Sequence, residues 1–336
     1  MRANVTKFIS SFLLGVCISS SVYADPITHA RTASDVDWVS AGISGVGGGS
    51  GTIALAGVSG TVSQAFLYWH GIAIGSGANY DSVDITINGN NISGTAIGTS
   101  TTNCWGDGNS VAYRADVTAF VSGDGDYDLA GLSSGTGHSA NGASLVVTFD
   151  DGDDNNNRDL VFFEGNDSSI ADGFPGEEDG WIASLSPIAY GGGTVGMEFH
   201  VADGQSFSDD SVSLSTPNGN LVIADSGVLW DGNSIATAGT SRTSNGELYD
   251  IHFFDITSAF GGVTGLTDLA LAGQFSPSDC HGLILGLVDL EPGSAPTPDD
   301  PGEAVAVPAL DSATLALLAA LILLIGVFAT RKITSP

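Results

Sequence analysis

Basic side chains are nearly absent from most of this 336-residue chain. Of its eight lysines and arginines, four lie within the first seven or the last six residues. The stretch 25–311 holds four arginines, no lysine and all 38 acidic residues, which gives it a formal charge of −34. Such a charge repels nucleic acid, so nucleic-acid binding is excluded. The missing lysine excludes Schiff-base catalysis and lysine–asparagine isopeptide bonds in this stretch.

Cysteine is also scarce, with three in the whole chain. Cys17 lies in an apolar N-terminal segment, which leaves Cys104 and Cys280 for the rest of the protein. In an oxidising compartment an even pair favours a disulfide bond. That bond would close a long loop and stabilise the fold by about 4–5 kcal/mol in the chain-entropy model. Two free thiols are the alternative.

Amphipathic patterns with a helical period are missing between the two ends of the chain. Short apolar runs rich in Val, Ile, Leu and Phe alternate instead with turn clusters, and glycine occurs 47 times. This pattern predicts an all-β fold. We expect strands near 62–70, 82–88, 111–118, 126–132, 142–149, 181–189, 194–201, 210–215, 220–224, 248–257, 267–273 and 282–290. Asn88-Gly89 and Asn218-Gly219 are hairpin signals.

Enzyme motifs are missing as well. The chain has no His-Glu-x-x-His sequence, no Gly-x-Ser-x-Gly elbow and no phosphate-binding glycine spacing. His200 with Asp203, or His252 with Asp255, would at most be fragments of a metal site, and a histidine in the core or at a strand edge is the simpler interpretation. We therefore predict no catalytic residues.

Two halves of the chain carry similar segments in the same order. Tyr113–Phe120 resembles His252–Phe260, Leu129–Gly131 matches Leu271–Gly273, and Gly142–Val147 parallels Gly282–Leu287. The order predicts two tandem, jelly-roll-like β-sandwich units, 25–150 and 160–291. Chance similarity in a glycine-rich chain is the alternative.

The acidic loop 151–159 between these halves supplies oxygen ligands at every second residue. Ca²⁺ prefers six to eight oxygens, and a curved loop of this spacing can surround one. It lacks the glycine and glutamate positions of an EF-hand. We regard it as a candidate calcium site, and a solvated linker as the alternative. Its candidate ligands are Asp151, Asp153, Asn155, Asn157 and Asp159.

Two tryptophans raise a second interpretation. Trp105 and Trp230 lie beside the tripeptides Asp107-Gly108-Asn109 and Asp231-Gly232-Asn233, at related places in the two halves. A tryptophan face beside carboxylates and amides suits a surface glycan. The alternative is that both tryptophans pack over the ends of the sandwiches.

The two ends of the chain predict export. Arg2 and Lys7 precede an apolar run and Val22-Tyr23-Ala24, so we expect signal peptidase to cleave the segment 1–24 between Ala24 and Asp25. A lipoprotein signal at Cys17 is a weaker alternative. Residues 313–330 are apolar and precede Arg331-Lys332. At about 1.5 Å per residue they would cross a bilayer as one transmembrane helix. The Pro- and acid-rich stretch 292–308 predicts a stalk, and the basic pair should stay in the cytoplasm.

The sequence Val307-Pro308-Ala309-Leu310, followed by the apolar run and then Arg331-Lys332, resembles the IPTL-CTERM class of bacterial sorting signals. Here Val-Pro-Ala-Leu replaces Ile-Pro-Thr-Leu. The class is related to the PEP-CTERM tails that exosortase-type transpeptidases process. The resemblance covers about 30 residues of the tail 309–336 and its preceding motif. It implies cleavage near Pro308 and delivery to the cell surface or the extracellular matrix.

The body is similar to prokaryotic surface domains of the DUF3344 type. The similar segments are Leu67–Gly71, Arg114–Thr118 and Gly142–Val147. This resemblance implies a fold and a location but no activity. We therefore expect an exported, anchored or sorted surface protein, without enzymatic activity and with a structural or adhesive role. A glycan-binding module and a secreted hydrolase of unrecognised type are the alternatives.

Overall fold

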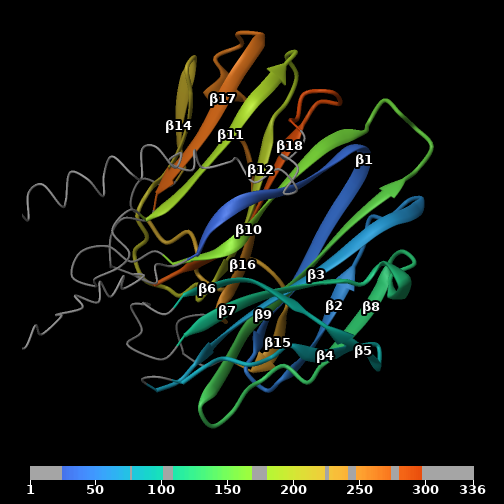
Figure 1. Ribbon diagram of the computed structural model, residues 1–336, viewed down its shortest axis with the longest axis vertical. Helices are drawn as coiled ribbons and strands as arrows, with labels where there is room; N and C mark the ends of the chain where they lie inside the picture. Colours follow the sequence, from blue (N-terminus) through green and yellow to red (C-terminus); the bar gives the residue numbers. More distant parts are fainter. Residues whose placement is uncertain are drawn as a thin grey trace, which may run out of the picture. The chain divides into compact units, whose positions relative to one another are not determined.

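A computed structural model describes residues 25–75, 78–100, 109–168, 180–223, 227–240, 247–273 and 280–296 (Figure 1). These residues form β-strands and two short 3-10 helices within one compact unit that ends at Pro296. Every ladder among them is antiparallel except the one between β1 and β15. The all-β prediction is confirmed. In this described part, no helix combines the length and the hydrophobicity needed to cross a bilayer.

The first half of the fold contains nine strands and one 3-10 helix in the described residues. They are β1 Asp25–Val46, β2 Ser50–Leu55, β3 Thr61–Ala73, β4 Asp84–Ile87, β5 Asn90–Ser93, β6 Thr95–Ser100, β7 Ser110–Asp116, η1 Thr118–Phe120, β8 Gly125–Ala130 and β9 His138–Asp150.

The described second half again contains nine strands and one 3-10 helix. They are β10 Arg158–Ser168, β11 Trp181–Tyr190, β12 Gly196–Ala202, β13 Val212–Thr216, β14 Gly219–Ile223, β15 Thr237–Thr240, β16 Tyr249–Asp255, η2 Thr257–Phe260, β17 Gly265–Gly273 and β18 Gly282–Leu290.

The two halves use the same strand order. One small sheet runs β2-β8-β4-β5, and the other runs β11-β17-β13-β14. The large sheet runs β16-β12-β18-β10-β1-β9-β3-β7-β6, with β15 beside β1. Read outward from the β10–β1 pair, β18, β12 and β16 on one side correspond to β9, β3 and β7 on the other. The large sheet therefore has a pseudo-symmetric centre between β10 and β1.

Strand β1 joins the halves. Its first part, Asp25 to Val36, pairs with β10, and its second part, Asp37 to Ser44, pairs with β9. The first part contains three register shifts. Such shifts bend a strand and break its alternation of side chains. One strand thus belongs to both halves.

The hydrophobic core has two large parts, each between a small sheet and one half of the large sheet. In the first half, Ile53, Ile87 and Leu129 of the small sheet pack with Leu67 and Trp69 of β3. The second part repeats this arrangement with the corresponding strands: Trp181, Leu214 and Leu271 pack with Phe199 and Val288.

A third apolar cluster lies between the two halves of the large sheet. It contains Phe66 and Val146 from the first half and Phe162 and Leu287 from the second. The rings of Phe66 and Phe162 meet edge to face with their centroids 6.2 Å apart. The strands thus form four layers, with the two halves of the large sheet face to face in the middle.

The Asp-x-Thr sequence before each 3-10 helix has the same geometry in both halves. Thr118 Oγ1 accepts a hydrogen bond from Ala65 N at 2.9 Å, and Thr257 Oγ1 accepts one from Val195 N at 2.9 Å. Thr118 N donates to Asp116 Oδ1 at 3.0 Å. Thr257 N donates to Asp255 Oδ1 at 2.9 Å. The sequence similarity between the halves therefore corresponds to a repeated local structure.

Each of the twelve expected strands overlaps an observed strand. The Asn88-Gly89 hairpin is confirmed, because both residues have positive φ between β4 and β5. The second hairpin turns one residue earlier than Asn218-Gly219. Its turn residues are Pro217 and Asn218, because Gly219 is the first residue of β14 and pairs with Thr216 of β13. The separation of the two expected units is corrected, because their strands share one large sheet through β1 and β10.

Candidate functional site

A buried carboxylate lies between the two halves of the large sheet. Glu164 on β10 is 5% exposed. Its Oε1 accepts hydrogen bonds from Arg31 Nη2 at 2.5 Å and from the Tyr68 hydroxyl at 2.7 Å. Its Oε2 accepts one from Arg114 Nη1 at 2.7 Å. Two cations and one phenol thus converge on one carboxylate.

The surroundings of Glu164 are aromatic. The Arg31 guanidinium carbon lies 3.8 Å from the centroid of the Phe66 ring, a cation–π contact. Burial, together with the negative charge of Glu164, raises the pKa of Tyr68 well above its usual value. The Tyr68 hydroxyl therefore keeps its proton and donates a hydrogen bond to Glu164.

A second polar chain runs beside this carboxylate. His200 Nδ1 lies 2.7 Å from Ser144 Oγ, and His200 Nε2 lies 2.9 Å from Glu198 Oε1. The Tyr249 hydroxyl lies 3.2 Å from Ser144 Oγ. Serine, histidine and glutamate in this order have the composition of a nucleophilic triad. However, Ser144 and His200 are 0% exposed, so a substrate in solvent does not reach the serine in this conformation.

The hydrogen bonds of Glu164 and His200 join the two halves of the fold, and two asparagines add further ones. Asn166 Nδ2 donates to Ser110 O at 3.1 Å, and Asn141 Nδ2 donates to Asp203 Oδ1 at 3.2 Å. We call the whole set the polar seam. It consists of Ser110, Arg114, Tyr68, Asn141 and Ser144 from the first half, and Glu164, Asn166, His200, Asp203 and Tyr249 from the second.

His70 lies in the same region and is fully buried beside Asn166. Burial lowers the pKa of His70 to about 3. By strand pairing His70 corresponds to His200, since His70 pairs with Ala112, four residues before Asp116 on β7, and His200 pairs with Ile251, four residues before Asp255 on β16. The ring of His70 is therefore neutral at pH 7.

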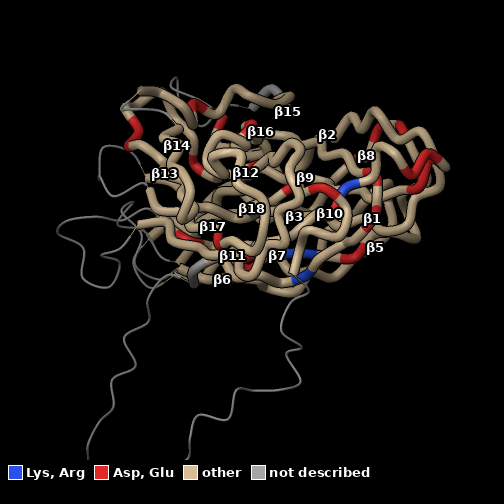
Figure 2. Tube along the Cα trace, turned by 90° about the horizontal axis from the view of Figure 1, so that it is seen from above, with Lys and Arg blue, Asp and Glu red and all other residues tan. Residues whose placement is uncertain are grey.

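A third arginine, Arg158, forms ion pairs at the other end of β10. Arg158 Nε and Nη1 contact Asp289 Oδ1 at 2.5 Å and Glu291 Oε1 at 2.6 Å. Burial raises the pKa of Asp289, while Arg158 opposes this shift. All three arginines in the described residues are thus in ion pairs with the chain's own carboxylates. Figure 2 shows the result, with acidic segments spread over a body that has few basic ones.

The acidic loop does not gather its five candidate calcium ligands. Asn157 Nδ2 donates to Asp35 O, and Asp159 accepts from Asp35 N through Oδ1 and from Ala295 N through Oδ2. Asp159 is 1% exposed in β10. The five-residue site is therefore corrected, because two members pair with distant backbone.

The exposed part of this loop forms turns of its own. Asp151 Oδ1 accepts from Asp153 N at 2.8 Å, and Asp153 Oδ1 accepts from Asn155 N at 3.1 Å. The first of these bonds lowers the pKa of Asp151. Within the described ranges, no group of three or more His, Cys, Asp and Glu residues is placed to hold a metal ion. Calcium binding by the loop 151–159 stays a prediction.

Trp230 is 0% exposed, so the prediction that it stacks on a glycan is corrected. Its ring lies 5.7 Å, centroid to centroid, from both Trp181 and Phe199 in the second core. Trp230 belongs to the second core. Trp105 lies outside the described residues.

Of the two predicted disulfide partners, Cys280 is among the described residues and Cys104 is not. Cys280 is disulfide-bonded. Cys104 lies outside the described residues, so the pairing of Cys104 with Cys280 stays a prediction.

The predicted targeting segments also lie outside the described residues. This applies to the signal segment through Ala24, the transmembrane segment 313–330 and the sorting residues Val307, Pro308, Ala309, Leu310, Arg331 and Lys332. Asp25 is described, and it begins β1 by pairing with Asn166.

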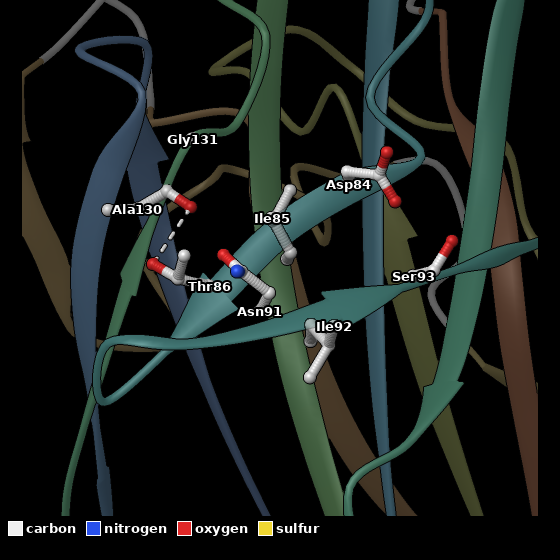
Figure 3. Close-up of a pocket in the computed structure, with 8 residues that line it drawn as sticks. All are labelled: Asp84, Ile85, Thr86, Asn91, Ile92, Ser93, Ala130 and Gly131. Carbon is white, nitrogen blue, oxygen red and sulfur yellow. Dashed lines mark hydrogen bonds between the residues drawn. The ribbon is translucent and has the colours of Figure 1, made fainter.

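An open hollow lies on the first small sheet, beside the β4–β5 hairpin. It has a volume of about 580 Å³, and Figure 3 shows the eight residues around it. They are Asp84, Ile85, Thr86, Asn91, Ile92, Ser93, Ala130 and Gly131. Nothing in the motifs of the sequence indicated this hollow.

Comparison with known proteins gives no match, either to a family model or to a curated protein sequence.

Proposed function

We propose that this chain is an exported bacterial surface or extracellular-matrix protein with a structural or adhesive role. In this proposal signal peptidase removes 1–24, and the two similar halves, joined through one large sheet, form the body. A stalk and a transmembrane tail then hold it, or an exosortase-type enzyme sorts it. The resemblance of the tail to the IPTL-CTERM class and of the body to DUF3344-type domains supports this proposal.

The observation that carries the proposal is that the arginines of the described body are paired with its own carboxylates. Every arginine in the described part neutralises a carboxylate of the same chain, which leaves the exterior of the body predominantly acidic. Such a surface is self-repulsive at low salt and is stabilised where salt or divalent cations screen it. The cell envelope and its exterior suit such a protein.

The hydrolase alternative gains no support from the serine–histidine–glutamate chain. The Ser144 hydroxyl forms hydrogen bonds with His200 and Tyr249 of the second half, and it is fully buried there. A nucleophile must contact its substrate, and this serine contacts the other half of its own fold. We assign the chain a structural role.

Mass spectrometry of the protein isolated from its native cells tests the proposal. We expect an N-terminus at Asp25, together with either an intact tail in the membrane fraction or a C-terminus near Pro308 in the matrix fraction. Replacing Arg331 and Lys332 by serine should disturb retention, because the basic pair holds the cytoplasmic end. Replacing Arg242, the remaining arginine of the body, is the matched control. A full-length cytosolic chain that retains Met1 would refute the proposal.

A further inference from the structure

The two small sheets share a strand order but differ at one ladder. In the second half, β13 pairs with β17 at four positions, from Val212–Gly273 to Ser215–Ala270. In the first half, β4 pairs with β8 at only two, Thr86–Ala130 and Ile87–Leu129. Because β13 and β17 pair over four positions, the shared strand order does not by itself require the short β4–β8 ladder.

The shortened ladder opens the hollow. After Ala130 the chain turns away at Gly131, which has a φ of +85°. Strand β4 continues toward Asp84 without a ladder partner on β8, and the space of about 580 Å³ lies at this divergence. Its volume is within the range of about 300–1,000 Å³ that is usual for small-molecule sites.

Polar side chains line the open face of the hollow in two cross-strand pairs. Asp84 pairs with Ser93, and Thr86 pairs with Asn91. Figure 3 shows Asp84 and Ser93 on one side of the hollow, with Thr86 next to the carbonyl of Ala130. Ile85 and Ile92 are buried in the first core and fix the two strands from below.

Three of these polar side chains are available to a ligand. Asp84, Asn91 and Ser93 are exposed, and no other described residue forms a hydrogen bond with their side chains. Thr86 Oγ1 donates to Ala130 O across 3.4 Å, a weak bond that a ligand can replace. The lining contains one carboxylate and no cationic group.

We propose that this hollow binds an uncharged sugar residue. Vicinal hydroxyl groups both donate and accept hydrogen bonds, and a carboxylate, a carboxamide and two hydroxyls offer complementary partners. The Asp84 carboxylate and the acidic body repel phosphorylated and carboxylated ligands. This site differs from the tryptophan sites expected from the sequence.

The second small sheet provides an internal comparison. The row of residues that corresponds to Thr86 and Asn91 there consists of Ile182, Ala272, Ser213 and Val222. Here β13 pairs with β17 at four positions, and three of the four residues in this row are aliphatic. We therefore expect one sugar site in the described body, on the first half alone.

Saturation-transfer NMR on the purified full chain tests the proposal. The probes are the methyl glycosides of glucose, galactose, mannose and N-acetylglucosamine at about 10 mM, because one shallow site should bind in the millimolar range. We expect a transfer signal from at least one probe. Asn91→Ala and Asp84→Ala should each weaken that binding about tenfold or more.

The matched control is Asn220→Ala. Asn220 is an exposed asparagine on β14, the strand of the second half that corresponds to β5. It should leave sugar binding unchanged, and thermal melts should show that all three variants are folded. Absence of a signal from every probe overturns the proposal. A signal that Asn91→Ala and Asp84→Ala leave intact overturns it as well.

Discussion

At the scale of single residues, Glu164 determines how the charges of the body are arranged. It accepts hydrogen bonds from Arg31, Tyr68 and Arg114, and these donors come from three different strands. A buried carboxylate without partners is very unfavourable, and a well-coordinated one can be tolerated. The arrangement is therefore sensitive to the loss of any one member.

Replacing Glu164 by glutamine should destabilise the protein by about 2–4 kcal/mol, because it leaves two partly buried arginines without a counter-charge. Equilibrium unfolding in urea measures this change. Asp154→Asn, in the exposed loop, is the control and should change the free energy of unfolding by less than about 0.5 kcal/mol. Equal effects of the two substitutions would show that the Glu164 contacts contribute little.

His70 predicts an acid dependence of stability. Its pKa is about 3 in the folded protein, whereas the ordinary pKa of a histidine side chain is 6.5. Between these values the unfolded chain binds more protons, so the contribution of His70 to stability is complete above pH 6.5 and is lost as the pH falls toward 3. In His70→Leu this contribution disappears.

The measurement is urea unfolding as a function of pH. The stability of the original protein relative to His70→Leu should fall by up to about 1.4 kcal/mol per pH unit within this window. Asp250, whose pKa burial raises, acts in the opposite direction in both proteins and cancels in the comparison. Parallel pH profiles would contradict the assignment.

At the scale of elements, the repeated Asp-x-Thr sequence ties each 3-10 helix to a strand of the large sheet. Thr118→Val and Thr257→Val keep the side-chain shape but remove the acceptor for Ala65 N and Val195 N. Each should cost about 1–2 kcal/mol, since a backbone N–H loses its partner.

Thermal and urea unfolding of these two variants should give similar losses, because the geometry is the same in both halves. Thr118→Ser and Thr257→Ser retain the hydroxyl and serve as controls. If one valine variant were destabilised and the other neutral, the two sequences would not have equivalent roles.

Strands with simple alternation or short apolar runs were predicted from the sequence. The described strands that were not predicted are β1, β2, β5, β6, β10 and β15, and β1 and β10 show why. The register shifts of β1 break the period of two that marks a strand. In β10, four apolar residues precede Glu164, Asn166 and Asp167, which have the composition of a loop. They are buried because their partners come from other strands.

At the scale of the whole molecule, the polar seam makes the two halves interdependent. Tyr68, Arg114 and Ser144 of the first half bond to Glu164 and His200 of the second. A separated half would expose these polar groups next to the third apolar cluster. The halves are thus parts of one cooperative unit.

We expect residues 25–296 to unfold in one transition, with fluorescence and circular dichroism changing together. Residues 25–150 alone should not give the dispersed NMR spectrum of a folded domain, because they lack the strands that cover β3 and β9. A folded first half, or two separate transitions, would contradict this.

The sequence by itself determined the all-β class, most strands and the Asn88-Gly89 turn, because alternation and turn chemistry act between neighbouring residues. It also showed the repeated segments. Only the tertiary structure decided that Trp230 is enclosed, that Asp159 binds backbone at Asp35 and Ala295, and that Glu164 meets two arginines. These outcomes depend on partners that are brought together from distant positions when the two halves pack face to face.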